Sequence, residues 1–309
     1  MTSLHRLSAR GLFAVLSLGL AACLLAQEAT PPPTPTPTPA SAPQASPEET
    51  EKPEPTPTPK APEGSVIINL PSVDVPRPGT LTLLFTHRFS QPVADSDIHS
   101  LFSFDSGADI GIGLAYAPVR GLDVSFYRSS SIDIYELAAK YHVLSKGPVG
   151  VAVRAGWDWR TQVGAIFDAV PDYSRSGFFG QIVAAINIGS RARFTVVPTY
   201  VSEMSGQPTT TPRDLYKDVF QVPVALSIAV TPTVNVQGEV YPNTGKTDSA
   251  GVGWIVSIEK TLLRHRFAFT CGNVRSTTVD QYVSPVPFGN LAKNYYLGFN
   301  LVRQWSLKK

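Results

Sequence analysis

From about residue 80 to residue 305 the chain repeats one pattern, in which apolar side chains stand at every second position. The segment 149–159 shows it best, because Val151, Val153 and Trp157 alternate with Ala152, Arg154 and other small or charged residues. A period of two is that of a β-strand with one apolar and one polar face. Helical periodicity is scarce, so the sequence predicts an all-β fold. We expect strands within 81–89, 110–116, 122–127, 135–143, 149–159, 178–188, 194–200, 220–230, 234–240, 252–258, 267–272 and 295–305.

The links between these twelve segments alternate in length. Every long link is odd-numbered and every even-numbered link is short, which is typical of a barrel with long extracellular loops and short periplasmic turns. A soluble β-sandwich is the competing interpretation, but its strands are shorter on average than a bilayer requires. We therefore predict a transmembrane antiparallel up-and-down β-barrel of about twelve strands over residues 65–309, in the bacterial outer membrane.

Charged residues are few, and most of those in the predicted strands stand on the polar faces, which supports the same fold. Asp, Glu, Lys and Arg make up 16% of the chain, against roughly 25% in soluble domains. Aromatic residues near strand ends, among them Trp157, Tyr241 and Trp305, suit interfacial girdles. Charged residues on the polar strand faces are candidates for lining a lumen. They are Glu136, Lys140, Arg154, Asp158, Arg191, Arg193, Glu239 and Glu259.

The N-terminus predicts export. Basic residues before an apolar run indicate a signal peptide over residues 1–26, too short for a permanent membrane helix. Cleavage after Ala26 is one prediction, and lipidation of Cys23 within a lipobox-like sequence is the other. Residues 27–64 hold Thr-Pro repeats and a cluster of glutamates, which predicts a disordered acidic linker. Such a linker can contact the cell wall or a periplasmic partner.

Four segments resemble an uncharacterised family of bacterial outer-membrane β-barrels. The resemblance lies in an H-R-F element at 87–89, an alternating I-G-L-x-Y strand at 112–116, an R-S-S turn at 128–130 and a K-Y strand at 140–141. It implies an outer-membrane barrel and no catalytic residues, since the family has no assigned activity.

Three functions remain open at this stage. The first is a passive pore or small-solute transporter with a narrow lumen of mixed charge. Such a small barrel can be filled by side chains or by residues 65–79 folding inward. The second is a closed barrel that docks a partner through its loops or its Pro-rich arm. The third is an outer-membrane hydrolase, for which Asp95, Asp97 and His99 in the first long loop are the candidate group, although a solvated loop also explains them.

We expect no enzymatic activity, no cofactor and no metal site. The expected partners are outer-membrane lipid and small solutes. The near-neutral charge of +2 gives no basis for nucleic-acid binding. Cys271 is expected to be a small apolar residue of a strand.

Overall fold

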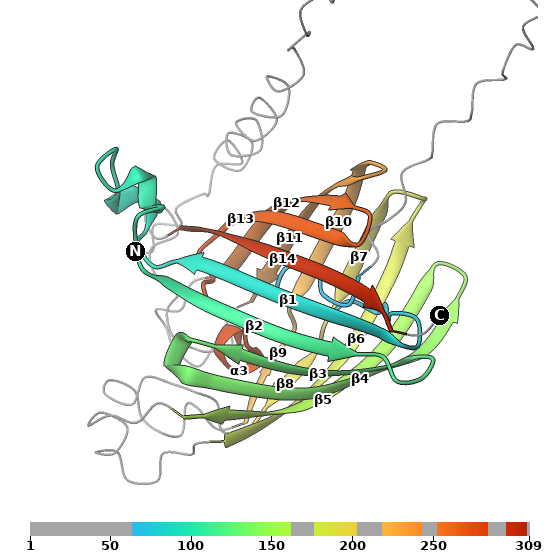
Figure 1. Cartoon of the computed structure of the whole chain (residues 1–309). Helices are drawn as coiled ribbons and strands as arrows, with labels where there is room; N and C mark the ends of the chain where they lie inside the picture. The colour runs from blue at the N-terminus through green and yellow to red at the C-terminus, as the bar shows by residue number, and fades with distance from the viewer. Residues whose placement is uncertain (1–63, 162–175, 203–217, 243–251, 284–294, 308–309) are drawn as a thin grey trace, which may run out of the picture. The chain divides into compact units, whose positions relative to one another are not determined.

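The computed structural model describes residues 64–161, 176–202, 218–242, 252–283 and 295–307, all within the compact unit Pro55–Lys309. The predicted signal peptide and most of the predicted linker lie outside the described residues. Strands dominate (Figure 1). The strands are β1 Thr80–Phe89, β2 Ala108–Tyr116, β3 Leu122–Ser129, β4 Ile134–Lys146, β5 Val149–Arg160, β6 Ser176–Ile188, β7 Ala192–Val196, β8 Thr199–Val201, β9 Val219–Gln221, β10 Val224–Thr231, β11 Val234–Tyr241, β12 Gly253–Leu262, β13 His265–Gly272 and β14 Tyr296–Ser306.

Short helices occupy the links. They are the 3-10 turns η1 Val93–Asp95, η2 Leu101–Ser103 and η3 Ser131–Asp133, and the single-turn helix α3 Val279–Tyr282. No helix among the described residues is long and apolar enough to cross a membrane.

The strands close into a ring. All strand pairs are antiparallel, and most join neighbours in sequence. The first strand, β1, also pairs with the last strand, β14, from Thr80↔Ser306 to Arg88↔Gly298. The pairing of β5 with β6 joins the two halves of the sheet. Because closure leaves no long unpaired edge, the fold meets the requirement that bilayer hydrocarbon places on a sheet. The prediction of an antiparallel up-and-down barrel is confirmed.

Two prolines explain why fourteen strand segments form twelve spanning strands. Pro198 separates β7 from β8, and Pro223 separates β9 from β10. Proline has no N–H for a sheet ladder, but its carbonyl still accepts. The Ile182 amide donates to Pro198 O at 3.0 Å and the Val197 amide donates to Pro223 O at 2.9 Å, so the pairing continues across both interruptions.

The two faces of the wall differ as the alternation predicts. On β4, Leu137 and Tyr141 are half-exposed and point outward, whereas Glu136, Ala138 and Lys140 are buried. Tyr241 corrects one expectation: it is fully buried, so it points inward and does not belong to the interfacial girdle. Its neighbour Val240 occupies the exposed position there.

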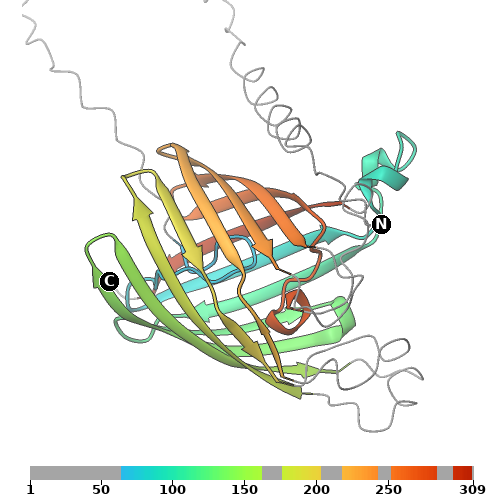
Figure 2. The ribbon, with the colours of Figure 1, turned by 180° about the vertical axis from the view of Figure 1, so that it is seen from behind.

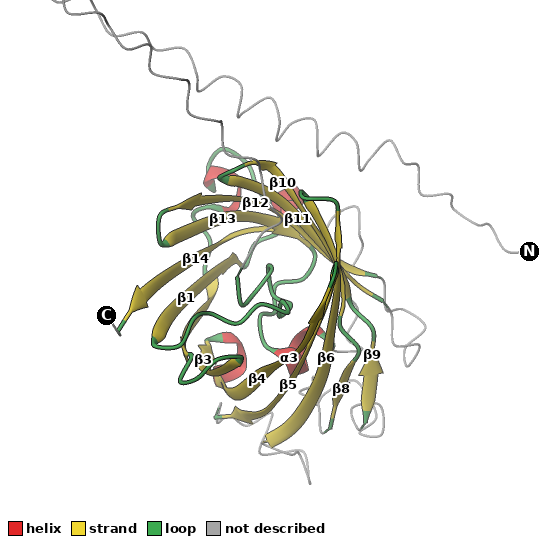
Figure 3. Ribbon diagram, turned by 90° about the vertical axis from the view of Figure 1, so that its right-hand side faces the viewer, coloured by secondary structure: helices red, strands yellow, loops and turns green. Residues whose placement is uncertain are grey.

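The interior contains chain as well as side chains. The segment that follows residue 63 runs within the ring, as the blue trace in Figures 1 and 2 shows. Figure 3 shows loop segments and α3 enclosed by the strands. Buried apolar residues of both segments join the wall in one cluster that includes Ile68, Leu70, Val279 and Tyr282. The core of this barrel is therefore built partly from two inserted segments.

Candidate functional site: the occupied lumen

Residues 64–74, here called the N-terminal insert, form a tight hairpin inside the barrel. Val66 and Pro71 form a β-bridge, and the Ile67 amide donates to Leu70 O at 2.8 Å. The apolar side chains of Ile67, Ile68, Leu70 and Val73 are buried. The sequence left open whether side chains or residues 65–79 fill the narrow lumen. The structure shows that the first part of this segment folds inward.

Lys140 on β4 holds the base of this hairpin. Its ammonium donates to Ser65 O at 2.9 Å, to Ser72 O at 3.1 Å and to Asp74 O at 2.7 Å. An ammonium has three donors and no acceptor, so all of its donors are used on main-chain carbonyls of the insert. Because the side chain is buried, these three hydrogen bonds replace the water that its charge has lost.

Glu239 on β11 holds the tip of the hairpin. Its carboxylate accepts the amides of Ile68 at 2.8 Å, Asn69 at 3.1 Å and Leu70 at 3.0 Å. The Tyr241 hydroxyl donates to the same carboxylate. A carboxylate is an acceptor only, and three consecutive amides at the turn match it without any need for a particular side chain.

Further wall residues secure the insert between these two points. Arg266 donates to Val66 O at 3.0 Å and pairs with Glu259 at 2.9 Å. Asn300 donates to Ile68 O at 2.9 Å. Arg193 pairs with Asp74, and its Nε donates to Asn187 Oδ1 at 2.8 Å. Most of these contacts reach main-chain atoms of the insert.

Residues 273–283, here called the α3 insert, enter the lumen from the link between β13 and β14. Asp280 accepts from Arg160 on β5 at 3.2 Å, with both side chains buried. The Val279 amide donates to Glu136 Oε2 at 3.2 Å, and Gln181 donates to the Tyr282 hydroxyl at 2.9 Å.

Tyr282 is fully buried. Its ring lies 5.3 Å from that of Tyr241. The N-terminal insert contacts Glu239 and the α3 insert contacts Tyr241, so the two inserts approach each other at this pair of wall residues.

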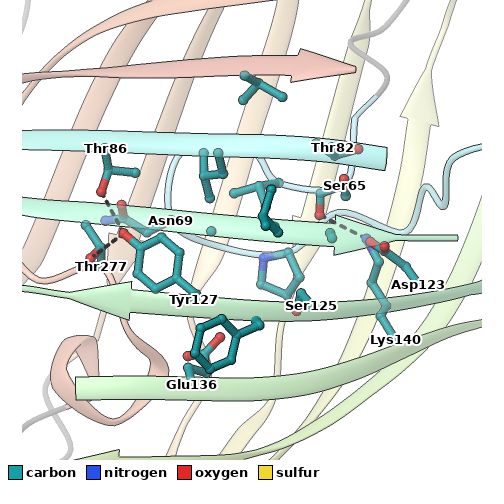
Figure 4. Close-up of a pocket in the computed structure, with 18 of the residues that line it drawn as sticks. Ser65, Asn69, Thr82, Thr86, Asp123, Ser125, Tyr127, Glu136, Lys140 and Thr277 are labelled. Carbon is teal, nitrogen blue, oxygen red and sulfur yellow. Dashed lines mark hydrogen bonds between the residues drawn. The ribbon is translucent and has the colours of Figure 1, made fainter. Parts of the chain in front are cut away.

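A cavity of about 90 Å³ remains between the N-terminal insert and the wall formed by β1–β4 (Figure 4). At this size it can hold several water molecules. Asp123 projects into it, and its Oδ1 has no hydrogen-bond partner among the described residues. Tyr127 closes one end through hydrogen bonds with Thr86 at 2.6 Å and Thr277 at 2.8 Å. The cavity is lined by Ser65, Asn69, Thr82, Thr86, Asp123, Ser125, Tyr127, Lys140 and other residues.

The structure brings together seven of the eight charged residues singled out in the sequence. Lys140, Glu239, Glu259 and Arg193 contact the N-terminal insert directly or through a paired arginine. Glu136 pairs with Arg154 and accepts from the α3 insert.

Asp158 is buried across from Glu136 on the paired strand. Neither of its carboxylate oxygens has a hydrogen-bond partner among the described residues. Arg191 differs from the other seven, because it lies exposed in the turn before β7.

Sequence reasoning missed several lumen residues. Arg88, named above only within the H-R-F element, is buried and donates to Asn69 Oδ1 at 3.0 Å and Asn300 Oδ1 at 2.8 Å. Its inward register on β1 was the available signal, because it alternates with outward Phe89. Arg160 and Asp280 were missed as well, and Asp280 sits in a link where strand alternation gives no information.

The predicted hydrolase candidates are not assembled into a site within the described part of the chain. The Asp97 carboxylate accepts the amides of His99 at 2.9 Å and Ser100 at 3.2 Å, which is a turn-stabilising role. The His87 ring stacks on Phe299 at 4.9 Å on the outward face. Over the described ranges, no group of three His, Cys, Asp or Glu side chains is placed to hold a metal. Cys271 is a free cysteine in β13.

The closed antiparallel wall, its apolar outer face and its polar interior define a transmembrane β-barrel of the bacterial outer membrane. The chain belongs to the family described as membrane bound beta barrel domain (DUF5777), which matches residues 63–305. The resemblance seen in the sequence is thereby confirmed. No curated protein matches the chain by sequence.

Several solved outer-membrane barrels are similar to the chain at low sequence identity. Outer membrane phospholipase A from Escherichia coli is 13% identical over 72% of this chain and 89% of its own, with a TM-score of 0.43. The NanC porin is 7% identical over 74% and 100%, with a TM-score of 0.45. An outer membrane channel from Pseudomonas putida F1 is 12% identical over 75% and 97%, with a TM-score of 0.46. Similarity at this level carries no argument about activity.

Proposed function

We propose that the protein is a non-enzymatic outer-membrane channel for small solutes, and that its two inserts hold the lumen closed in the conformation described. The observation that carries this proposal is that charged side chains of the barrel wall bind the N-terminal insert. Lys140 and Glu239 bind main-chain atoms of the N-terminal insert, and neither is needed to close the sheet. With the insert displaced, both side chains would line a water-filled passage of mixed charge.

The residual cavity supports the same proposal. It runs along β2, whose inward lining positions are Gly113 and Ala115, so this strand contributes little side-chain bulk to the cavity. A passage that opens by a shift of the insert would begin along this side. The polar lining, with Asp123 and Lys140 side by side on paired strands, suits small hydrated solutes of either sign.

A disulfide lock tests the channel directly. A Cβ placed on Gly150 would lie 3.6 Å from Val73 Cβ, within the Cβ separation that disulfides span. In a Cys271→Ser background, Val73→Cys with Gly150→Cys should attach the insert to β5. We expect no conductance steps in planar bilayers while the lock is oxidised and steps after reduction. The single variant Val73→Cys is the matched control and should conduct under both conditions.

The second candidate function is a closed barrel that docks a partner. The insert leads directly into residues 27–64, the predicted linker, which we propose reaches the cell wall or a periplasmic partner. If neither the wild-type protein nor the reduced variant conducts above background, the channel proposal fails and the docking function stands in its place.

A further inference from the structure

The link between β1 and β2 exposes an unusual number of large apolar side chains. Ile98 is 63% exposed, Leu101 57%, Phe102 53% and Phe104 48%. These four residues are called the apolar loop face below. Exposed apolar side chains that cluster in this way mark an interaction surface more often than a water-facing loop.

This loop packs on the outside of the barrel rather than over the lumen. The Phe104 ring lies 5.0 Å from that of Phe89 and 6.4 Å from that of Phe269. Phe89 and Phe269 stand at outward positions of β1 and β13, next to the aromatic rings of His87 and Phe299. In Figure 1 the loop projects at the end of the barrel opposite the start of β1. The apolar loop face is therefore continuous with the lipid-facing surface of the wall.

The loop has a defined shape that is held by its own hydrogen bonds. Leu101, Phe102 and Ser103 have φ values of 46°, 53° and 84°, a left-handed region that non-glycine residues seldom adopt. The turn is held by the Ser103 hydroxyl, which donates to Gln91 O at 2.6 Å, and by the Phe102 amide, which donates to Asp97 O at 2.8 Å. Backbone that meets hydrocarbon must satisfy its hydrogen bonds internally. In this turn every amide from Leu101 to Ser106 donates to a carbonyl of the same loop, while Leu101 and Phe102 are exposed.

We propose that the apolar loop face inserts into the outer leaflet of the bilayer and contacts the acyl chains beside β1, β13 and β14. The start of β1 pairs with the end of β14, so the loop lies at the opposite rim. Because outer-membrane barrels carry their long links on the extracellular side, we place this rim outside the cell. Its occupant is lipid, because its aromatic contacts join it to a surface that already faces lipid.

Site-directed fluorescence tests this assignment. In a Cys271→Ser background, a polarity-sensitive fluorophore is attached at Phe102→Cys, and the full-length protein is reconstituted in phosphatidylcholine vesicles with nitroxide-labelled acyl chains. Phe126→Cys on the outward face of β3 provides the lipid reference. Arg191→Cys, in an exposed turn at the other rim, provides the water reference. Leu101→Cys is a second loop site in case the first variant folds poorly.

The loop probe should follow the lipid reference. We expect acyl-chain nitroxides to quench it to a similar extent as Phe126→Cys, and aqueous iodide to quench it at least about threefold less than Arg191→Cys. Strong iodide quenching with weak nitroxide quenching at both loop sites would overturn the proposal. A probe shielded from both quenchers would mean that protein, such as a second copy of the chain, covers the loop, and would also overturn it.

Discussion

Replacement of Lys140 by methionine isolates the contribution of one side chain to lumen closure. Methionine keeps most of the length of the aliphatic stem and removes the ammonium, which donates to three carbonyls of the N-terminal insert. A net contribution of about 1 kcal/mol for each hydrogen bond gives about 3 kcal/mol for docking of the insert. At 1.4 kcal/mol for each factor of ten, the ratio of undocked to docked insert should rise roughly a hundredfold.

The assay is the open probability of single channels in planar bilayers. Lys260→Met is the matched control, because Lys260 lies exposed near the end of β12 and donates to Thr233 Oγ1 at 3.0 Å, away from the insert. We expect the Lys140 variant to open far more often than either the wild type or this control. An unchanged open probability, in protein whose gel mobility still shifts on heating as a folded barrel's does, would refute the reasoning that this ammonium holds the insert.

Three further outcomes follow from the structure. Asp280→Asn removes one charge of the buried pair with Arg160, so it should lower the unfolding free energy by about 3–5 kcal/mol, measured by denaturant titration in detergent. Gly111→Ala would place a Cβ 1.7 Å from the Tyr127 hydroxyl and should cost about 1–3 kcal/mol in the same titration. Gly180→Ala, where nothing lies within 4 Å, should cost less. Mass spectrometry of the exported protein should show a mature start at Gln27; a lipid-modified start would contradict that cleavage site.

The architecture was readable from the sequence because strand alternation is a local property. Each of the twelve predicted segments contains a strand of the barrel, including the two that Pro198 and Pro223 interrupt. Within the strands alternation gave the correct face for the charged residues, whereas Arg191 lies just outside its strand, in a turn. Tyr241 shows the cost of setting alternation aside. It was assigned to the girdle as an aromatic residue at a strand end, although the inward register of Glu239 already placed it inside.

The arrangement of the lumen was only partly readable. The sequence identified Lys140 and Glu239 as charged residues of polar strand faces and left open that residues 65–79 fold inward, but it did not connect the two. The contacted residues of the insert lie 66 to 171 positions away along the chain, and such contacts leave no periodic trace. The sequence also gave no sign that residues 273–283 turn inward, because a polar link with one helical turn reads the same whether it projects into water or into a lumen.

The N-terminal insert also constrains the order in which the barrel can be assembled. Ile68 O accepts from Asn300, 232 positions further along the chain, and the ring closes only when β1 meets β14. Contacts of such separation form late, because the loop they close must first be ordered. The first part of the folded domain to be exported therefore waits for the last strand, and the sheet must wrap around the insert as it closes. The insert would serve as the template for the barrel during assembly before it serves as the plug of the finished lumen.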